Sequence, residues 1–540
     1  MTDQPSLHDP NGEHDDETPA TEAASHAASP QLTRRTFALG AGALGTAAVA
    51  VAVGFDALTS EGTQAAPSPP TATQPAIRFQ TESTPPPSPI PTATTPPAAT
   101  PGVPAGMALV TSPRLPLKGV DAAQAAALLN GTQQWRDVGS PISLPVTPFA
   151  ISGMEGNGLA SPRKVNDYAA LVAELAKTPG GIAVVPIDQI DFQVNRLDVD
   201  GIDPLTTPGN AIRIGVTGDI IPGRNVAIHA RQYGDWSHPF LKMKDFLNSF
   251  DVTMSNFECV ISDTIAPPEE SNANTFDFIA SSDVIGAMKA CGIDAISLAN
   301  NHTAWNDGSY GIDVFTNMLT LLEQGGLPYF GGGRDLDQAQ LGFQTTVGDT
   351  SIVFIGIDGV TANVDFAGQI GTVGENIGSG FAGASASKAG TNPLDLASVN
   401  AKIAALAGQY DIVIPYFHMG EEYVWTVPAW CQQVTHAAID NGATMVLTNH
   451  PHLIQGMETY KGVPIIYSLG NFVFDQMFSL DTRTGYVLDL TFTGKKVSGL
   501  RIHGFEIEDF NQPRLMNESE NAALMDRFWR STDLLAARGS

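Results

Sequence analysis

Cysteine is scarce in this chain, since its 540 residues include only three, and no two of them form a Cys-x-x-Cys pair. Cysteines that are odd in number and far apart predict neither a disulfide framework nor a structural zinc site. We expect Cys259, Cys291 and Cys431 to be small buried apolar residues. Cys259 directly follows Glu258, so a ligand role is the alternative for that thiol.

Lysine and arginine are also few, with 28 against 56 aspartates and glutamates, which gives a formal net charge of −28. The phosphate backbone of a nucleic acid would repel such a chain, so we expect no nucleic-acid partner. An anionic lipid surface would not attract it either. The acidity favours solubility, and a polyanionic substrate would need a local basic patch or bound cations.

Long apolar runs are missing except near the start, where the uncharged residues 37–55 follow the pair Arg34-Arg35. Paired arginines before a mildly hydrophobic Ala/Gly-rich segment predict a twin-arginine export signal. A membrane anchor is the alternative, because 19 uncharged residues could cross a bilayer core of about 30 Å. Either interpretation of residues 1–59 places the bulk of the protein outside the cytoplasmic membrane.

Two further segments precede the main domain. Residues 60–105 are rich in Pro, Thr and Ser and predict a disordered spacer. Residues 106–208 predict a small α/β domain, with helices over 120–129 and 165–176 and a turn into a strand over 179–186. Their strings GTQQWRDVG and PGGIAVVP resemble parts of a phosphate-type periplasmic solute-binding protein. About 100 residues are too few for both lobes of that fold, so we expect a packing or helper module.

The chain is rich in polar side chains that end apolar, strand-like runs. Five such motifs occur: Asp219 after IRIGVT, Asn256-Phe257-Glu258 after DVTMS, Asn300-Asn301-His302 after DAISLA, His418 after DIVIPYF, and His450-Pro451-His452 after TMVLTN. Strand ends form the rim of a sheet, where α/β enzymes assemble their sites. Each motif alone has an ordinary explanation, such as a helix cap, a turn or a core histidine. Together they predict a shared pocket.

The chemistry of these side chains predicts a metal centre. Imidazole nitrogens, carboxylates and an amide oxygen suit divalent first-row metals such as Zn, Mn and Fe. Two ions about 3.5–4 Å apart could share the carboxylate of Glu258 and clamp a phosphoryl group. In an extended segment residues i and i+2 face the same way, so His450 and His452 should reach one cluster.

The surrounding pattern predicts two sheets with helices outside them. Helices are expected over 282–292, 311–325, 396–409 and 428–441, between the motif strands. An antiparallel stretch follows over 484–509 and a closing helix over 519–537, which completes an α/β sandwich. The Gly/Ala/Ser-rich segment 363–391 is expected to be a flexible insertion, either a lid or a plain loop.

From about Ile212 to Glu508 the chain resembles the CapA family, proteins associated with poly-γ-glutamate capsule synthesis. The strings that carry the resemblance are GDIIPGR at 218–224, NFE at 256–258, LANNH at 298–302, GGGRDLDQA at 331–339, HMGEEY at 418–423 and NHPHLIQGMETYKGVPIIYSLGNFVFDQ at 449–476. The domain of that family is similar to the calcineurin-like metallophosphoesterases, which implies an α-β-β-α sandwich over 211–510, with 511–540 as a C-terminal helix and tail.

The resemblance also implies roles for single residues. Asp219 and His452 would hold a first metal, Glu258 would bridge, and Asn301, His418 and His450 would hold the second. His302 would lie outside the ligand set as a general acid. Ile221 stands where phosphoesterases have the His of an Asp-x-His pair, and Thr448-Asn449 stands where the family often has Gly-His.

Two more side chains in the matching strings are candidates of a different kind. Arg224 and Glu422 are expected to contact substrate or to orient ligands, with surface ion pairing as the alternative. The expected cofactors are one or two divalent ions of Mn, Fe or Zn.

Three functions follow as expectations. The first is a cell-envelope protein of poly-γ-glutamate capsule synthesis, export or attachment that has membrane partners and handles an anionic polymer. The second is an exported metal-dependent hydrolase acting on a phosphoester. The third is a binding module without turnover.

Overall fold

The computed structural model describes residues 103–538 except 142, 207–208, 268–277, 305–310, 361–363, 366–368 and 371–382. By its contacts the chain divides into two units, Met1–Ala76 and Ile77–Ser540, and the described residues all belong to the second. The predicted export segment, the spacer up to residue 102 and most of the predicted insertion lie outside the described residues. None of the described helices combines the length and apolar character that a membrane crossing requires.

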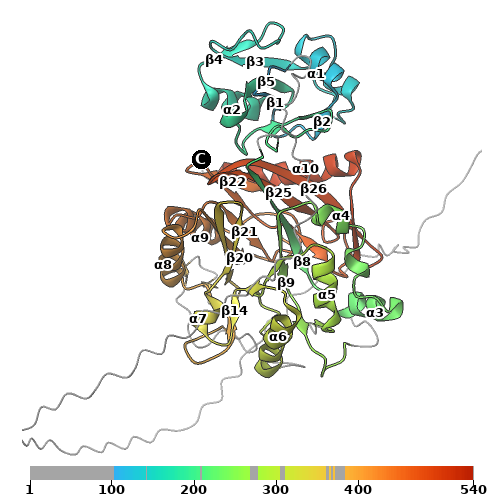
Figure 1. Cartoon of the computed structure of the whole chain (residues 1–540), viewed down its shortest axis with the longest axis vertical. Coiled ribbons are helices and arrows are strands. Elements are labelled where there is room, and N and C mark those ends of the chain that lie inside the picture. Colours follow the sequence, from blue (N-terminus) through green and yellow to red (C-terminus); the bar gives the residue numbers. More distant parts are fainter. Residues whose placement is uncertain are drawn as a thin grey trace, which may run out of the picture. The chain divides into compact units, whose positions relative to one another are not determined.

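Residues 103–199 build a five-stranded sheet in the order β4-β3-β5-β1-β6 (Figure 1). Its strands are β1 (Met107–Thr111), β3 (Thr147–Ile151), β4 (Arg163–Val165), β5 (Gly181–Pro186) and β6 (Asn195–Arg196). A short pair, β2 (Gly119–Val120) and β7 (Asp198–Val199), lies beside it. Two helices pack here, α1 (Ala122–Leu129), which begins with a capping box, and α2 (Tyr168–Lys177), which Asp167 caps. Each helix contributes to a separate apolar cluster.

The remaining described chain contains two larger sheets. The eight-stranded sheet has the order β13-β12-β9-β8-β25-β26-β27, with β24 paired to β8. Its strands are β8 (Ala211–Ile220), β9 (Val252–Phe257), β12 (Ala295–Ser297), β13 (Tyr329–Phe330), β24 (Asn471–Val473), β25 (Thr484–Thr493), β26 (Lys496–Glu508) and β27 (Gln512–Leu515).

The six-stranded sheet has the order β15-β16-β20-β21-β23-β22. Its strands are β15 (Phe343–Val347), β16 (Thr350–Asp358), β20 (Ile412–His418), β21 (Val446–Asn449), β22 (Met457–Tyr460) and β23 (Val463–Ile466). Short pairs complete the strands, β10 (Val260–Ile261) with β11 (Ile279–Ala280), β14 (Gly332–Gly333) with β19 (Gly390–Thr391), and β17 (Val364–Asp365) with β18 (Gln369–Ile370).

The helices of this part follow the strands in the usual α/β alternation. They are α3 (Arg224–Tyr233), α4 (Lys244–Leu247), α5 (Asp283–Ala290), α6 (Ile312–Gly325), α7 (Leu336–Ala339), α8 (Leu396–Ala407), α9 (Ala429–Asp440) and α10 (Glu518–Arg538). The helices predicted at 282–292, 311–325, 396–409, 428–441 and 519–537 are confirmed, with ends that shift by at most a few residues.

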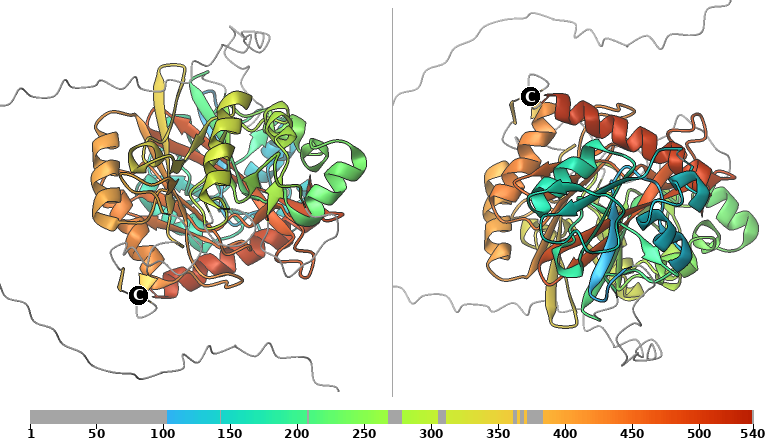
Figure 2. Two further views of the ribbon diagram at one scale, coloured as in Figure 1. Left: turned by 90° about the horizontal axis from the view of Figure 1, so that it is seen from below. Right: turned by 90° about the horizontal axis from the view of Figure 1, so that it is seen from above.

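Three apolar clusters establish the layers. One cluster joins residues of both large sheets, among them Val216, Met254, Ile414 and Leu447, and therefore lies between them. A second cluster packs α3, α5 and α6 against the outer face of the eight-stranded sheet. A third packs α8 and α9 against the outer face of the six-stranded sheet, and these helices flank the sheets in Figures 1 and 2. The predicted α-β-β-α sandwich, preceded by a small α/β unit, is confirmed.

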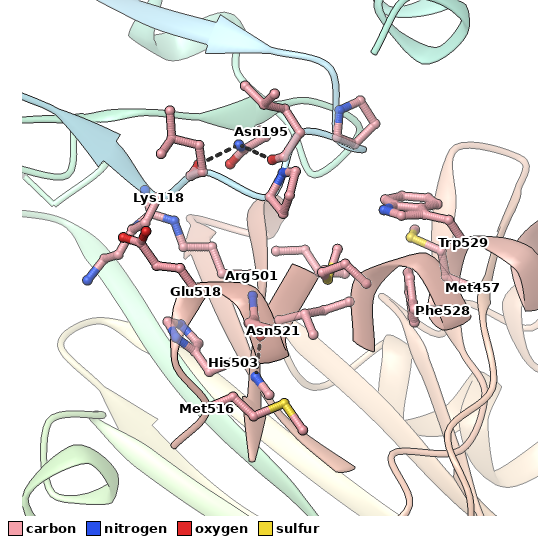
Figure 3. A pocket seen from close by; sticks show the side chains of 18 of the residues that line it. Lys118, Asn195, Met457, Arg501, His503, Met516, Glu518, Asn521, Phe528 and Trp529 are labelled. Carbon is pink, nitrogen blue, oxygen red and sulfur yellow. Dashed lines mark hydrogen bonds between the residues drawn. The ribbon is translucent and has the colours of Figure 1, made fainter. Parts of the chain in front are cut away.

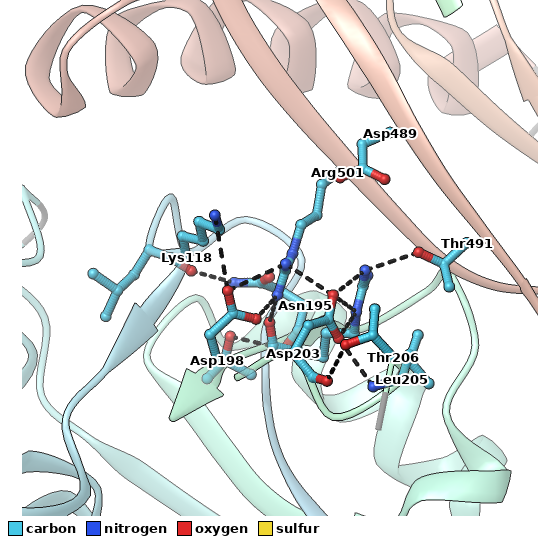
Figure 4. Close-up of polar contacts among 12 residues, drawn as sticks. Lys118, Asn195, Asp198, Asp203, Leu205, Thr206, Asp489, Thr491 and Arg501 are labelled. Atoms are coloured by element: carbon cyan, nitrogen blue, oxygen red, sulfur yellow. Dashed lines mark hydrogen bonds and ion pairs between the residues drawn. The ribbon is translucent and has the colours of Figure 1, made fainter. Parts of the chain in front are cut away.

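An ionic network joins residues 196–203 to strands β25 and β26 (Figure 4). The fully buried Arg196 donates to Asp203 Oδ2 at 2.7 Å and to Thr491 Oγ1 at 3.0 Å. Arg501 of β26 donates to Asp198 Oδ1 at 2.5 Å and to Asp203 Oδ2 at 3.0 Å. These buried, paired charges fasten the small N-terminal sheet to the sandwich.

A cavity of about 230 Å³ lies beside this network (Figure 3). Its wall is largely apolar and includes Leu115, Met457, Met516, Phe528 and Trp529. The guanidinium of Arg114 lies 5.0 Å from the centre of the ring of Trp529, one of the wall residues, in a cation–π contact.

Candidate metal centre

The candidate site lies at one edge of the sandwich, where strands from both large sheets end at their carboxyl termini. In the eight-stranded sheet Asp219 pairs in register with both Asn256 and Asn471. In the six-stranded sheet His418 pairs in register with both Asp358 and Asn449. Polar residues at these levels therefore meet at one edge of the sandwich, as the strand-end motifs predict.

The first motif begins with Gly218 because a larger residue would not fit at this position. A Cβ atom at position 218 would collide with the carbonyl oxygen of Gly470. That close approach lets β24 lie directly beside Asp219, whose backbone N–H donates to the same carbonyl oxygen at 3.1 Å. The glycine thus positions Asp219 rather than taking part in chemistry.

Two groups of side chains could each hold a metal ion. They are Glu258 with His418 and His450, and Glu258 with Asp219 and His452. Within each group the ligand atoms lie within 4.8 Å of one another, and every member is buried. Glu258 belongs to both groups, so its carboxylate lies between the two candidate ion positions.

Asn301 and His302 lie at the margin of these groups. The Asn301 Oδ1 atom is 2.9 Å from His418 Nε2, so the amide oxygen faces the ring that the first group contains. His302 Nε2 is 3.9 Å from Glu258 Oε1, and His302 belongs to neither group. Its ring packs on Phe278 with centroids 4.6 Å apart, and its backbone N–H donates to Asn300 Oδ1 at 3.1 Å.

Glu258 is the most informative residue of the site. It is fully buried, and among the described residues neither of its carboxylate oxygens has a hydrogen-bond partner. Burial, and then the charges of Glu422 and Asp358, raise the pKa of this carboxyl well above its ordinary value. A buried carboxylate without donors is costly, and a cation compensates it better than a neutral neighbour does.

Asp219 repeats this pattern. Its Oδ1 atom accepts from Asn256 Nδ2 at 2.7 Å, while Oδ2 has no hydrogen-bond partner among the described residues. Burial and the nearby charge of Glu258 raise the pKa of Asp219 to about 7. Two buried carboxylates with open oxygens, next to histidine nitrogens, fit a divalent cation in both donor type and charge.

The four histidines of the site are held in the neutral form. Burial lowers the pKa of His302, His418, His450 and His452, and that of His452 falls to about 4. A neutral imidazole keeps a lone pair, which metal coordination requires.

Amide side chains that the sequence analysis did not single out orient these groups. Asn256 Nδ2 lies 2.7 Å from Asp219 Oδ1 and 3.2 Å from His418 Nδ1, so one amide group contacts a member of each ligand group. Asn300 Nδ2 donates to Asn256 Oδ1 at 3.1 Å and to the Phe257 carbonyl at 2.9 Å. Both residues lie inside recognised motifs, but only their cross-strand contacts reveal this role.

Asn471 fixes the proton of His452. Its Nδ2 group donates to the carbonyl oxygens of Thr482, at 2.8 Å, and of His452, at 3.3 Å. The amide oxygen must then face His452 Nδ1, 2.8 Å away, so Nδ1 carries the proton and Nε2 keeps the lone pair. Asn471 was also missed from the sequence, although the string NFVFDQ contains it.

The backbone around His450 and His452 corrects one prediction. His450 has φ +112° and His452 has φ +57°, so this segment is not the extended strand that the i, i+2 argument assumed. Both rings nevertheless lie beside Glu258, which the two ligand groups share, with ring centroids 6.0 Å apart. Left-handed backbone at two non-glycine residues is strained and is typical of functional sites.

Arg224 forms an ion pair that is buried, not on the surface. Its guanidinium donates through two nitrogens to the Asp475 carboxylate, with Nε 3.2 Å from Oδ2. It also lies between the rings of Phe278 and Phe474, at 5.1 and 4.8 Å from their centres. Asp475, in the last matching string, was not identified as its partner from the sequence.

The other departures from the family pattern have structural explanations. Ile221 is fully buried in the apolar cluster under α3, and its N–H donates to the Val473 carbonyl at 2.7 Å. Asn449 Oδ1 accepts from Ser468 Oγ at 2.9 Å and from the Leu469 N–H at 2.8 Å, so it fastens the segment that leads to β24. Glu422 is exposed, and its charge contributes to the raised pKa of Glu258. Cys259 is buried and belongs to neither ligand group, as expected of an apolar residue.

Comparison with known proteins shows that the candidate site lies within a part of the chain that matches a known family. Residues 213–476 match the family described as "Bacterial capsule synthesis protein PGA_cap". This range contains every candidate ligand, from Asp219 to His452.

Two curated relatives carry related names. "Capsule biosynthesis protein CapA" of Bacillus anthracis is 27% identical over 268 residues, which cover 48% of this chain and 59% of that protein. "PGA biosynthesis protein CapA" of Bacillus subtilis (strain 168) is 27% identical over 273 residues, which cover 50% of this chain and 65% of that protein. The chain therefore spans less than two thirds of the length of each relative.

Among solved structures, a 5'-nucleotidase from Candida albicans SC5314 is similar with 13% identity and a TM-score of 0.32, over 60% of this chain and 58% of that one. A likeness of this size says nothing about the reaction of the present protein.

Proposed function

We propose that this protein acts at the cell envelope in the synthesis, export or attachment of poly-γ-glutamate. Support comes from residues 213–476, which match the family "Bacterial capsule synthesis protein PGA_cap", and from the similarity to two CapA proteins. In this proposal a divalent-metal centre takes part in handling the polymer. The observation that carries the proposal is Glu258, a fully buried carboxylate without hydrogen-bond donors among the described residues, shared by both ligand groups.

In the proposed centre, Asp219, Glu258 and His452 hold one ion. Glu258, His418, His450 and Asn301 hold a second. When bound, Mn, Fe or Zn ions supply positive charge that attracts and polarises an anionic oxygen group. This charge would also let an acidic protein approach an acidic polymer. The residues themselves orient the ligands through Asn256 and Asn471 and exclude water by burial.

Elemental analysis of the purified full-length protein tests the centre. We expect at least one equivalent of metal in the wild type and its loss in the double variant His450→Ala/His452→Ala. His436→Ala is the matched control, because His436 is partly buried and paired with Glu458 at 2.8 Å, and it belongs to neither ligand group. A metal-free wild type of normal stability would refute the centre.

The cellular role is tested by measurement of the polymer in the organism that encodes this protein. Deletion of the gene should lower cell-associated γ-linked glutamate polymer, and the wild-type gene should restore it. The His450→Ala/His452→Ala variant should fail to restore polymer at equal protein level. Full polymer in the deletion strain would argue against the capsule role.

A second candidate function, a metal-dependent phosphoester hydrolase, is favoured by the place of His302. This residue is buried 3.9 Å from the shared carboxylate, yet it belongs to neither ligand group. Its ring is held by Phe278 and its backbone by Asn300. Without substrate this imidazole is neutral, but an anionic substrate beside it would raise its pKa. The fixed ring, once protonated, suits proton donation to a leaving oxygen, a role typically worth about 10²–10⁴-fold in rate.

Hydrolysis of bis(4-nitrophenyl) phosphate by the metal-loaded protein tests this candidate. His302→Ala should keep its metal and lose most of the activity, whereas His418→Ala should lose both. Wild-type protein that holds metal but shows no metal-dependent hydrolysis, while His302→Ala still lowers polymer in cells, would exclude the hydrolase and leave the capsule role.

A further inference from the structure

Two exposed aromatic side chains lie next to the candidate metal centre, the first beside His452 and the second beside the first. Tyr423 is 43% exposed and Phe478 is 71% exposed, although most large apolar side chains of the described chain are buried. Their rings contact each other edge to face, with centroids 5.7 Å apart. Exposed aromatic groups that gather beside a site are costly in water and commonly mark a binding surface.

The pair is built into the fold rather than left on a loose loop. The Tyr423 hydroxyl accepts from Gln476 Nε2 at 2.7 Å, and its N–H donates to the Pro451 carbonyl at 2.9 Å. Tyr423 also has φ +60°, a strained conformation for a tyrosine.

The loop that presents Phe478 is tied to the sandwich on both sides. Thr482 Oγ1 donates to the Gln476 carbonyl at 2.8 Å, and Arg527 pairs with Asp481 at 2.6 Å. Asn471, which orients His452, also donates to the Thr482 carbonyl at 2.8 Å. One side chain thus fixes both the candidate ligand and the loop with the exposed ring.

The pair continues directly into the metal centre. Tyr423 follows His418 by five residues in the matching string HMGEEY. Its ring centroid is 6.0 Å from that of His452, at an interplanar angle of 32°. Phe478, Tyr423 and His452 therefore form a row of rings that leads from solvent to a candidate ligand.

We propose that Tyr423 and Phe478 form a subsite for an uncharged apolar or aromatic group that is attached to the anionic group held at the metal centre. This inference rests on the proposed metal centre and specifies which kind of bound molecule the centre would accept. The exposed carboxylates of Glu421 and Glu422, next to Tyr423 in the chain, repel a second anionic group at this position. The preferred occupant of the subsite is thus an apolar segment next to the metal-held oxyanion, such as the methylene carbons between successive carboxylates of a γ-linked glutamate polymer.

Calorimetric titration of the metal-loaded full-length protein tests the subsite with inorganic phosphate, methylphosphonate and phenylphosphonate as probes. Phenylphosphonate should bind roughly three- to tenfold more tightly than methylphosphonate, as expected for one or two aromatic contacts. Phe478→Ala should abolish this preference and leave metal content and phosphate affinity unchanged. Phe510→Ala, which removes a 42% exposed ring on the turn between β26 and β27, is the matched control and should keep the preference.

The possible results distinguish failure of the subsite from failure of the proposed metal centre. Metal-loaded protein that binds phosphate but does not distinguish the two phosphonates overturns the subsite alone. The same holds for a preference that survives in both Phe478→Ala and Tyr423→Ala. Protein that takes up no metal overturns the proposed centre and the subsite with it.

Discussion

Glu258 shows at the scale of one residue why the centre suits a cation. Its pKa is raised in the folded protein, so the unfolded chain gives up this proton at lower pH than the folded chain does. Without metal, folding stability is therefore lost as the pH rises above the ordinary glutamate value of about 4.3. A bound cation reverses that penalty, because it stabilises the ionised carboxylate.

Glu258→Gln is expected to abolish metal binding and to make the metal-free protein more stable than metal-free wild type at pH 7. The amide keeps the shape of the side chain and removes the uncompensated buried charge. Elemental analysis and thermal unfolding in chelator between pH 4 and pH 8 measure the two effects. Equal stability of the two metal-free proteins across that range would contradict the argument.

Asn471→Leu is expected to weaken metal binding about 10- to 100-fold, because the His452 ring loses the acceptor that fixes its proton and its orientation. Competition with a chelator of known affinity measures the change. Asn441→Leu is the control, since Asn441 donates to the Ala437 carbonyl at the end of α9, away from the strand ends. Thermal unfolding of both variants separates loss of affinity from loss of fold.

The candidate metal ligands could be identified from the sequence, but the side chains that hydrogen-bond to the site residues could not. Asp219, Glu258, His418 and His450 each end a recognisable apolar run, and a strand end has a predictable place in an α/β sheet. Asn256, Asn471 and Asp475 act across strands, on side chains 37, 19 and 251 residues away in the sequence. Such contacts depend on strand order, which the local pattern does not contain.

At the scale of elements, helix periods and strand runs placed the sandwich helices correctly, whereas the segment after β21 was predicted wrongly. The sequence TNHPH has no glycine at the positions that take positive φ, so nothing in it signals a left-handed backbone. Tertiary contacts impose that conformation. The expected lid or loop over 363–391, most of which lies outside the described residues, stays a prediction.

The network between residues 196–203 and strands β25 and β26 is expected to hold the small N-terminal sheet in place. Burial alone would raise the pKa of Asp203, but Arg196 and Arg501 outweigh burial and lower it. A lowered pKa means that the stabilisation is present above the ordinary aspartate value and is lost as the pH falls through the folded-state value. A fall in pH through the folded-state pKa of Asp203 should therefore weaken this junction.

Asp203→Asn is expected to lower the free energy of unfolding by about 3 kcal/mol at pH 7, because it leaves the buried Arg196 and the partly buried Arg501 short of a counter-charge. Asp440→Asn, which breaks the exposed pair with Lys461, is the control and should have a much smaller effect, because water screens that pair. Denaturant unfolding measures both. A cost for Asp203→Asn no larger than that of the control would show that the network contributes little.

For the whole molecule, the acidic composition limits how the protein can be held at the proposed location, the cell envelope. A net charge of −28 keeps the protein from anionic surfaces, so its placement at the envelope has to come from another part of the chain. Residues 1–59, outside the described range, are the proposed source. The division of residues 60–208 into a spacer and a helper module likewise remains a prediction.

Replacing both Arg34 and Arg35 by Lys is expected to retain the protein in the cytoplasm, because a weakly apolar Ala/Gly segment is a poor substitute signal for other export routes. Cell fractionation with immunodetection measures the distribution. Arg78→Lys is the control, since it makes the same charge-conserving change in the Pro-rich stretch, outside the arginine pair. Unchanged surface delivery of the double variant would argue against a twin-arginine route.

The two large sheets contribute different halves of the candidate centre. Asp219 and Glu258 come from the eight-stranded sheet, and the imidazoles of His418, His450 and His452 come from the six-stranded sheet or the turn after it. On the proposed ligand set, a growing chain that has left the ribosome only as far as residue 400 contains both carboxylates and no imidazole partner for them. Capture of one ion then has to wait until His450 has emerged and capture of the other until His452 has, so loading is a late step of biosynthesis.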